Sequence, residues 1–275
     1  MTGKIDPGVS LIVSTYNWPE ALNLCLISIS KQCVLPNEVI IADDGSTEET
    51  RKLVQEHQLN FPVPLIHVWQ ADDGFQLAKI RNKAIARASK EYIVQIDGDL
   101  ILDYHFIQDH VAFSRQSAFV SGTRVQMSSA LSRKVLDNKA TRVSMLSKGI
   151  INFFNGFRIP VLRHFLAARY KSKDPAYVRG CNMAFWKADL INVNGFNESI
   201  VGWGREDSEL AVRLMNSGVK KRILKFGAIA FHIYHKEVSR AKLAHNEELL
   251  TNAIQNNVKT CTAGLSQHII AYKPK

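Results

Sequence analysis

The chain has 275 residues, of which 46% are hydrophobic and 22% charged, and its formal net charge is +10. This composition is ordinary for a globular protein with a sizeable core, and it excludes collagenous, disordered and low-complexity chains. No apolar run approaches the roughly 18 residues that span a bilayer. The four cysteines form no C-x-x-C pair, which disfavours zinc fingers and a disulfide framework. The short polar start does not resemble a secretory signal, so we expect a cytoplasmic protein.

The excess positive charge belongs to one segment of the chain. Between Arg133 and Lys173 there are ten lysines and arginines against one acid, Asp137, which leaves +9 of the total +10. This segment also carries apolar residues, and we expect residues 128–173 to be helical and amphipathic. Basic residues beside an apolar stripe suit an anionic membrane surface. A solvated basic face over the core, or a groove for an acidic glycan, would give the same pattern.

Strands and helices alternate in the first part of the sequence. Apolar, β-branched runs predict four strands, at residues 9–16, 38–42, 64–69 and 91–96. Helices are expected between them, the first capped by Asn17, the second beginning at a capping box of Ser46 and Glu49, and the third over residues 77–89. This order predicts an α/β protein with a mostly parallel sheet covered on both faces.

The second part of the sequence has weaker signals. A strand is expected near residues 177–185 and another over 225–232. Between them, a helix over 206–217 should end at Gly218, a residue suited to the left-handed backbone that follows many helices. The tail from about residue 236 to 257 is expected to be helical.

Polar residues stand at the carboxyl ends of three predicted strands, namely Ser14, Tyr16, Asp43, Asp44, Asp97 and Asp99. In a parallel sheet the ligand lies in the crevice beyond these ends. Asp97 and Asp99 are one residue apart and repel each other unless a hard cation with oxygen ligands neutralises them. A plain Asp-Gly-Asp turn is the alternative.

Three other groups of residues are candidates for chemistry. His232 and His235 follow the late strand and offer further metal ligands, although histidine pairs are more often ordinary structure. Glu206 and Asp207 open a helix, where the helix dipole favours ionised acids, so they are either helix caps or a general base. Two cations after the third strand, Lys79 and Arg81, are candidates for a donor diphosphate or for a solvated helix face.

Taken together, these segments resemble the inverting glycosyltransferases of family 2, which share the nucleotide-sugar-binding fold called GT-A. The resemblance covers about residues 8–235. Its first parts are VSLIVSTYN at 9–17, VIIADDGS at 39–46, Gly74 with the pair RN at 81–82, and YIVQIDGD at 92–99. Its later parts, RGCNMAFWK at 179–187, NGFNE at 194–198 and GWGREDSELAVRL at 202–214, resemble the galactosyltransferase-like C-terminal module. That module also occurs in β-1,4-galactosyltransferases and in bacterial chondroitin-type polymerases.

The resemblance implies one GT-A domain with a Rossmann-like, mostly parallel central sheet and flanking helices. Within it we expect a nucleotide-sugar-binding half, a basic helical insertion, an acceptor and catalytic half, and a helical tail. Their expected ranges are 8–125, 126–175, 176–235 and 236–275.

The resemblance also implies roles for the donor half of the site. The uracil would be held by four residues, Ser14, Tyr16, Asp43 and Asp44. Asp97 would lie near the ribose. Asp99 would bind the metal, Mn²⁺ or Mg²⁺, with His235 completing its shell and His232 ranked below it.

In the acceptor half, Asp207 would be the catalytic base. Trp203, Glu206 and Asn182 would shape the acceptor site. Close relatives often carry an acid at the position of Ser208, where it helps select N-acetylglucosamine, so the serine leaves the acceptor open.

We therefore predict an enzyme that moves a hexose or N-acetylhexosamine from a UDP-sugar to a glycan or lipid-linked acceptor, with inversion. Cell-surface polysaccharide biosynthesis is the expected setting, at the inner face of the membrane. A nucleotidyltransferase is the nearest alternative, but no Gly-rich phosphate loop follows the first strand. A nucleic-acid-binding protein would explain the basic segment, but acids at three strand ends would repel a phosphate backbone.

Overall fold

The computed structural model describes residues 7–167, 169–171, 174, 177–236 and 240–269. Three parts of the expectations fall outside these residues: the start of the chain, Lys173 of the basic segment, and residues 237–239 of the expected helical tail.

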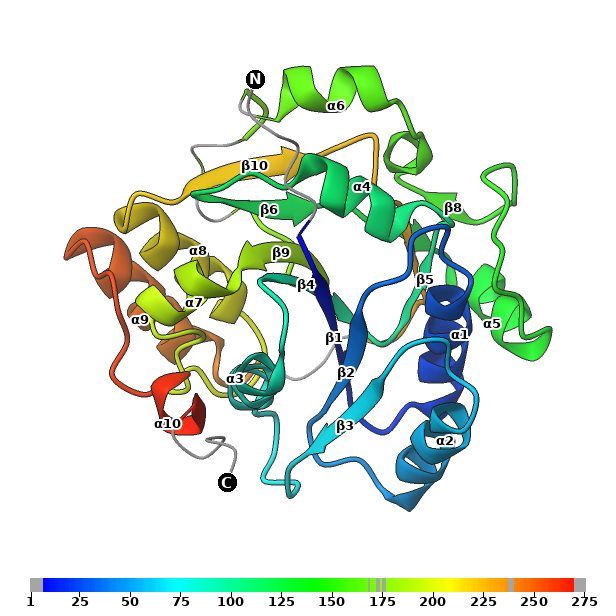
Figure 1. Ribbon diagram of the computed structural model, residues 1–275, viewed down its shortest axis with the longest axis horizontal. Coiled ribbons are helices and arrows are strands. Elements are labelled where there is room, and N and C mark those ends of the chain that lie inside the picture. Colours follow the sequence, from blue (N-terminus) through cyan, green and yellow to red (C-terminus); the bar gives the residue numbers. More distant parts are fainter. Residues whose placement is uncertain (1–6, 168, 172–173, 175–176, 237–239, 270–275) are drawn as a thin grey trace.

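A seven-stranded sheet forms the centre of the molecule, in the order β10-β6-β9-β4-β1-β2-β3 (Figure 1). Its strands are β1 (Val9–Thr15), β2 (Glu38–Asp43), β3 (Leu65–Trp69), β4 (Tyr92–Asp97), β6 (Ala118–Gly122), β9 (Asn182–Trp186) and β10 (Lys220–Leu224). Only β9 runs antiparallel to its neighbours, β4 and β6. The carboxyl ends of the other six strands therefore meet at one edge of the sheet, which confirms the predicted mostly parallel α/β architecture.

A second, smaller sheet has the order β5-β11-β7-β8. Its strands are β5 (Leu100–Leu102), β11 (Ala230–His232), β7 (Val125–Met127) and β8 (Ile150–Ile151). Because β5 begins three residues after β4 ends and β11 pairs with β5, this sheet brings residues near 232 back to the carboxyl end of β4.

The helices cover both faces of the large sheet. They are α1 (Pro19–Ser30), α2 (Glu48–Gln58), α3 (Leu77–Arg87), α4 (Phe106–Phe113), α5 (Ser129–Asp137), α6 (Pro160–Leu166), α7 (Lys187–Asn192), α8 (Glu206–Asn216), α9 (Leu243–Gln255) and α10 (Ser266–Ile269), with a 3₁₀ turn η1 (Phe153–Gly156). Among the described residues, no helix combines the length and hydropathy needed to cross a bilayer.

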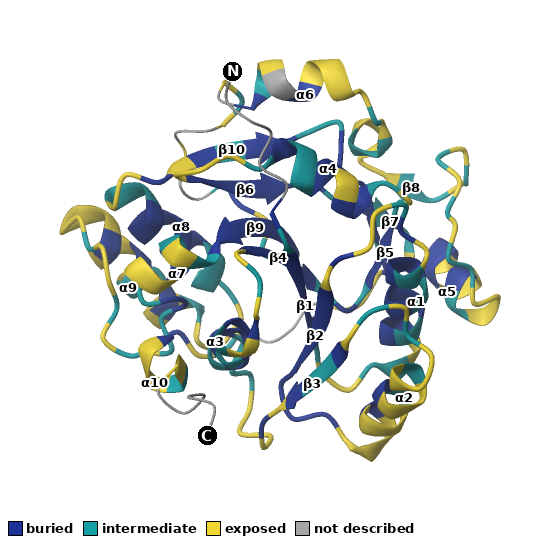
Figure 2. Cartoon of the chain, viewed as in Figure 1, coloured by how far each residue is buried: buried dark blue, intermediate teal, exposed yellow. Residues whose placement is uncertain are grey.

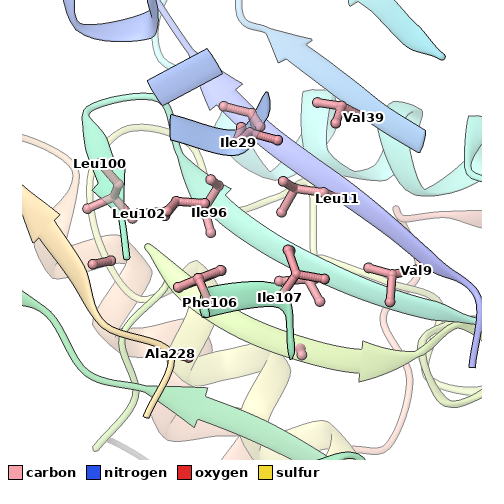
Figure 3. Close-up of a cluster of buried hydrophobic side chains, with 14 of the residues drawn as sticks. Val9, Leu11, Ile29, Val39, Ile96, Leu100, Leu102, Phe106, Ile107 and Ala228 are labelled. Carbon is pink, nitrogen blue, oxygen red and sulfur yellow. The ribbon is translucent and has the colours of Figure 1, made fainter. Parts of the chain in front are cut away.

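The core lies in two layers because strand side chains alternate between the faces of the sheet. Leu11 and Val13 of β1 belong to the cluster that includes side chains of α1, α2 and α4 (Figure 3). Ile12, between them, belongs to the cluster that includes side chains of α3, α7 and α8. All three β1 residues are fully buried, which explains why β1 reads as a continuous apolar run instead of an alternating one. Figure 2 shows the buried strands at the centre.

The two expected helix caps were wrong. Trp18 and Thr47 occupy the N-cap positions, and neither makes a side-chain cap hydrogen bond. Asn17 and Ser46 instead join the loops after β1 and β2. The Asn17 N–H donates to Ser46 Oγ at 2.9 Å, and the Thr47 N–H donates to Asn17 Oδ1 at 2.8 Å. Their polar groups thus fix the two loops to each other at the edge where the strand ends meet.

Two further expectations needed correction. The segment 128–173 contains helices α5 and α6, but the residues between them form loops, η1 and the short strand β8. The strand expected over 225–232 is confined to β11, and β10 ends before it. Phe226 and Ala228 have positive φ angles of 60° and 44°, a backbone conformation incompatible with a continuous strand.

Candidate active site

The carboxyl ends of β1, β4 and β6 border a cavity of about 940 Å³. The start of α8 and the loop before β9 line it as well. Of the residues predicted for the site, the cavity is lined by Ser14, Tyr16, Asp44, Arg81, Asp97, Asp99, Trp203, Glu206, Asp207 and His235. Sequence segments more than 200 residues apart therefore meet at one place, as expected for the carboxyl ends of parallel strands.

Arg81 of α3 connects three polar side chains that line the cavity. Its side chain is 1% exposed, and its guanidinium donates to Ser14 Oγ at 3.2 Å, to Asp97 Oδ1 at 3.0 Å and to Glu206 Oε1 at 3.2 Å. The planar fork of arginine suits such a three-way contact. Arg81 thus binds two carboxylates of the site, and its charge is not available for a diphosphate as the sequence suggested.

Lys79 was expected to meet the diphosphate together with Arg81. It lies two residues earlier on the same helix and does not line the cavity. Residues two apart on a helix point to different sides, and Lys79 instead acts electrostatically on Glu198 and Lys83. The predicted contact of Lys79 with the donor therefore has no support from the cavity lining.

Two adjacent carboxylates begin α8 and have different surroundings. Glu206 is nearly buried, and burial together with the charge of Asp207 raises its pKa to about 7, although Arg81 opposes this shift. Asp207 accepts hydrogen bonds from the Gly180 N–H at 2.9 Å and from the Ser208 N–H at 2.7 Å. These contacts hold Asp207 against the loop before β9, on the cavity wall.

Asp99, His232 and His235 form a cluster of potential metal ligands. Asp99 follows β4, His232 ends β11, and His235 lies three residues further. One ligand atom of each lies within 4.8 Å of the others, and Asp99 Oδ2 is 3.4 Å from Nε2 of both histidines. The sequence could not choose between the histidines, and the structure brings both to Asp99.

The chemistry of this cluster suits a divalent cation. Burial, followed by the charges of Arg124 and His235, lowers the pKa of His232 to about 3, so its imidazole is neutral and able to coordinate. Burial and the neighbouring Asp97 raise the pKa of Asp99 to about 8. Asp99 Oδ1 is buried without a hydrogen-bond partner in the described part of the chain. A cation would satisfy this oxygen and remove the cost of burying the carboxylate.

Tyr16 and Asp44, two of the residues expected to hold the uracil, both line the cavity. The Tyr16 ring is 49% exposed and lines the cavity. Asp44 accepts from Gln70 Nε2 at 2.6 Å and from the Gln76 N–H at 2.9 Å, and burial raises its pKa. These contacts fix the carboxylate at the cavity edge.

Asp43, by contrast, does not reach the cavity. It is completely buried, and its two oxygens contact the Ser46 N–H at 2.8 Å and His67 Nε2 at 2.9 Å. Asp43 is the last residue of β2, whereas Asp44 follows the strand and lines the cavity. The expected donor contact of Asp43 is wrong.

Of the residues expected to shape the acceptor site, Trp203 lines the cavity and Asn182 does not. Trp203 lines the cavity, is 39% exposed, and has Arg240 at 5.1 Å from its ring centroid. Ser208 also lines it, although its side chain is almost buried. Asn182 is fully buried and bonds to His110, to the Thr123 carbonyl and to the Ala228 carbonyl. The predicted acceptor contact of Asn182 is wrong, because all its polar atoms are used inside the core.

Sequence analysis missed Arg124, which lines the cavity and interacts electrostatically with Asp97 and Asp99. Its guanidinium donates to Cys181 Sγ at 3.5 Å and forms no ion pair of hydrogen-bonding length within the described residues. Burial opposes its charge, but Cys181, Asp97 and Asp99 hold its pKa above the usual range. Its position two residues after the carboxyl end of β6 is the feature of the sequence that could have identified it as a site residue.

Comparison with protein families gives two matches. The model described as "Glycosyl transferase family 2" matches residues 10–191, and "N-terminal domain of galactosyltransferase" matches residues 161–236.

Several proteins of similar sequence are named as polysaccharide synthases or glucosyltransferases. The chain is 28% identical to a chondroitin synthase of Escherichia coli over 83% of the chain and 35% of the relative. It is 26% identical to a hyaluronan synthase of Pasteurella multocida, over 82% of the chain and 24% of that protein. A validoxylamine A glucosyltransferase of Streptomyces hygroscopicus subsp. limoneus is 25% identical over 78% of the chain and 49% of its own length. The chain thus spans between about a quarter and a half of the length of these relatives.

Solved structures share the fold at low sequence identity. S. aureus TarS superimposes with a TM-score of 0.61 at 18% identity, covering 96% of this chain and 42% of TarS. The mannosyltransferase PcManGT from Pyrobaculum calidifontis, solved with GDP-Man and Mn²⁺, gives 0.59 at 19% identity, covering 98% of this chain and 77% of the other. These glycosyltransferases have the fold expected from the sequence. With a family match that covers well over half of its residues, the chain belongs to glycosyl transferase family 2.

Proposed function

We propose that the protein is a metal-dependent, inverting glycosyltransferase that transfers a hexose or N-acetylhexosamine from a UDP-sugar. Its acceptor is a glycan or a lipid-linked saccharide, in the synthesis of a cell-surface polysaccharide. The observation that carries the proposal is the cavity itself. The carboxylate Asp207 stands at one wall, and the Asp99, His232 and His235 cluster stands at another. Relatives named as chondroitin and hyaluronan synthases, and TarS complexes with UDP and UDP-GlcNAc, support the choice of substrates.

The donor is assigned to the half of the cavity formed by β1, β2 and β4. The exposed face of Tyr16 suits stacking against a uracil, and the fixed carboxylate of Asp44 suits its N–H. Asp97, whose side chain is one third exposed despite its contact with Arg81, keeps an oxygen for the ribose hydroxyls. Arg124 lines the cavity, is only partly exposed and forms no ion pair within the described residues, so we assign it to the diphosphate.

Asp99, His232 and His235 would hold Mn²⁺ or Mg²⁺. Asp99 Oδ1 has no hydrogen-bond partner among the described residues, and the imidazole of His232 is neutral. Both groups suit a divalent cation better than they suit an ion pair between Asp99 and a charged His232. A bound divalent cation supplies positive charge where the departing diphosphate becomes more negative.

Asp207 is the proposed general base. An acceptor hydroxyl gives its proton to the Asp207 carboxylate, and its oxygen forms a bond to the anomeric carbon. The bond from that carbon to UDP breaks at the same time, and UDP departs with the electron pair. Attack from the face opposite UDP inverts the configuration. Glu206, fixed by Arg81, lies beside the attacking hydroxyl and orients it.

The test compares Asp207→Asn with the wild type in a panel of UDP-sugars with Mn²⁺. The variant retains the shape of the side chain but loses its basicity, so we expect turnover to fall at least 1,000-fold while the Kd for UDP changes less than threefold. Glu248→Gln, an exposed position on α9, is the control and should behave as wild type. If UDP affinity falls as far as turnover, Asp207 is structural and the assignment fails.

Metal binding is measured apart from turnover, by titrating Mn²⁺ into the protein and following its electron paramagnetic resonance. His232→Ala combined with His235→Ala should weaken Mn²⁺ binding more than tenfold, whereas His245→Ala, on the exposed side of α9, should leave it unchanged. Equal Mn²⁺ affinity in both variants would contradict the metal site.

A further inference from the structure

Helix α6 exposes its apolar side chains and buries its charge. Val161, Leu162 and Phe165 are 84%, 43% and 61% exposed, whereas Arg163 is only 7% exposed. Arg163 donates to Asp109 Oδ1 at 2.6 Å. A helix on the surface of a soluble protein normally has the opposite arrangement. Figure 2 shows α6 at the rim of the molecule with most of its surface exposed.

The apolar surface continues along the chain into η1. Phe153, Phe154 and Phe157 are 40%, 72% and 37% exposed and contact one another, with ring centroids 4.9 to 6.4 Å apart. Ile159, at 37%, joins them to α6. We call the exposed apolar side chains of residues 153–165 the apolar face. Contiguous exposed apolar surface of this kind marks a contact with a partner or a membrane.

The charges around the apolar face have one sign. From residue 138 to residue 171 the sequence contains no aspartate or glutamate. Arg158 and Arg163 share the single carboxylate of Asp109, which balances one of their two charges, and Arg142, Lys148, Arg169 and Lys171 form no ion pair within the described residues. The Arg169 guanidinium lies over the Phe165 ring, 4.2 Å from its centroid, so a cation stands directly beside the apolar face.

This combination favours an anionic bilayer over a protein partner. Aromatic and aliphatic side chains enter the boundary between headgroups and acyl chains, and lysine and arginine bind anionic headgroups. A second copy of the same face would bring like charges together, since the face has no acid to offset them.

The apolar face also adjoins the cavity. Asn152 and Asn155, in the same segment, line the cavity. Asn155 Nδ2 donates to the Arg124 carbonyl at 3.0 Å, and Asn152 Nδ2 contacts Gln126 Oε1 at 2.9 Å. The segment is therefore anchored beside Arg124, while its phenylalanines face solvent. A bilayer at this face would lie next to the cavity.

We infer that the apolar face, with Arg169 and the other unpaired cations of residues 142–171, docks the enzyme on an anionic lipid bilayer and places a lipid-linked acceptor at the cavity. The placement of a lipid-linked acceptor at the cavity rests on the proposed function. Docking on the bilayer does not depend on it.

The experiment is co-sedimentation with vesicles of phosphatidylcholine alone and with 30% phosphatidylglycerol. The variant Phe154→Ser, Val161→Ser, Phe165→Ser replaces the most exposed side chains of the face. We expect its partition coefficient on anionic vesicles to fall at least tenfold, and Arg169→Glu to lower it about fivefold. The control, Leu59→Ser with Ile254→Ser, removes equally exposed apolar side chains from other surfaces and should bind as wild type. Binding of the wild type should weaken in 0.5 M NaCl.

Vesicle binding that ignores phosphatidylglycerol, or that survives the triple substitution, would overturn the docking surface. So would a concentration-dependent dimer that the triple substitution abolishes, because the face would then join two copies. UDP binding is measured on the same samples and should be equal in all variants. If no variant binds UDP, the proposed function fails while the docking surface stands.

Discussion

Arg81 and Arg124 line the same cavity, but their surroundings give them different tasks. Arg81 is enclosed by Ser14, Asp97 and Glu206, so its charge is balanced inside the protein. Arg124 has only the weak acceptor Cys181 within hydrogen-bonding distance in the described part of the structure. Arg124 is partly buried; a cation in this position without a carboxylate partner retains part of its desolvation cost, and an anionic ligand removes that cost. At the scale of single residues, it is the missing partner that marks Arg124 as a binding residue.

Replacing Arg124 by Gln should therefore weaken UDP binding while leaving the fold intact. A hydrogen bond to a charged group contributes about 1.5 to 3 kcal/mol, so we expect Kd to rise about 10- to 100-fold in calorimetric titration with Mn²⁺ present. Arg81→Gln is the comparison. It leaves Asp97 and Glu206 without their cation and should lower the melting temperature as well. An unchanged UDP affinity in Arg124→Gln would refute the assignment to the diphosphate.

At the scale of elements, a hydrogen bond between His110 and Asn182 joins α4 to β9. His110 Nε2 is 2.9 Å from Asn182 Oδ1, and both side chains are fully buried. The Asn182 amide nitrogen donates to the carbonyls of Thr123 and Ala228, so its oxygen must be the acceptor and His110 Nε2 carries the proton. Burial lowers the pKa of His110 to about 4, although the bond to Asn182 opposes the shift.

This histidine should make stability depend on pH. Between its ordinary pKa of about 6.5 and its folded value of about 4, the unfolded chain binds a proton that the folded protein does not. Stability is therefore lost as pH falls through this window, by up to about 3 kcal/mol. His110→Gln keeps a donor but does not titrate, so its urea unfolding free energy should fall less between pH 7 and pH 4. His245→Gln, on an exposed helix face, should keep the wild-type slope, and a wild-type slope in His110→Gln would contradict the prediction.

At the scale of the whole molecule, Asp109 ties three distant segments together. Arg158 and Arg163 donate to its oxygens at 2.8 Å and 2.6 Å, and the Ala228 N–H donates at 3.0 Å. Burial opposes ionisation, but these donors hold the pKa of Asp109 below its usual range. The contacts attach the segment that carries the apolar face to α4 and to the loop before β11 (Figure 1).

Removing this carboxylate should cost stability of the whole fold. Asp109→Ala leaves Arg163 nearly buried without a counter-charge, and breaking a buried pair in this way costs about 3 to 5 kcal/mol. Urea unfolding measures the loss. Glu48→Ala, which breaks an exposed pair with Arg51, is the control and should cost at most about 1 kcal/mol. Equal unfolding midpoints for the two variants would show that Asp109 does not hold these segments.

The first four strands of the large sheet and the place of the site could be predicted from local sequence patterns. The run VSLIVST predicts a strand buried on both faces, because it is short, rich in β-branched residues and has no amphipathic period. Once such strands alternate with helices, their carboxyl ends must lie together, which placed Ser14, Asp97 and Asp99 around one cavity.

Only the tertiary structure decided which polar residues are free to bind a ligand. Arg81 meets Glu206 from 125 residues away, and Asn182 meets His110 from 72 residues away. Whether a side chain is satisfied inside the protein depends on such partners, and no local pattern reveals them. For the same reason the sequence suggested Asp43, Lys79 and Asn182 as site residues and passed over Arg124. It predicted a basic, apolar segment, but only the structure shows that Asp109 holds Arg163 in a nearly buried position while the phenylalanines of the segment stay exposed.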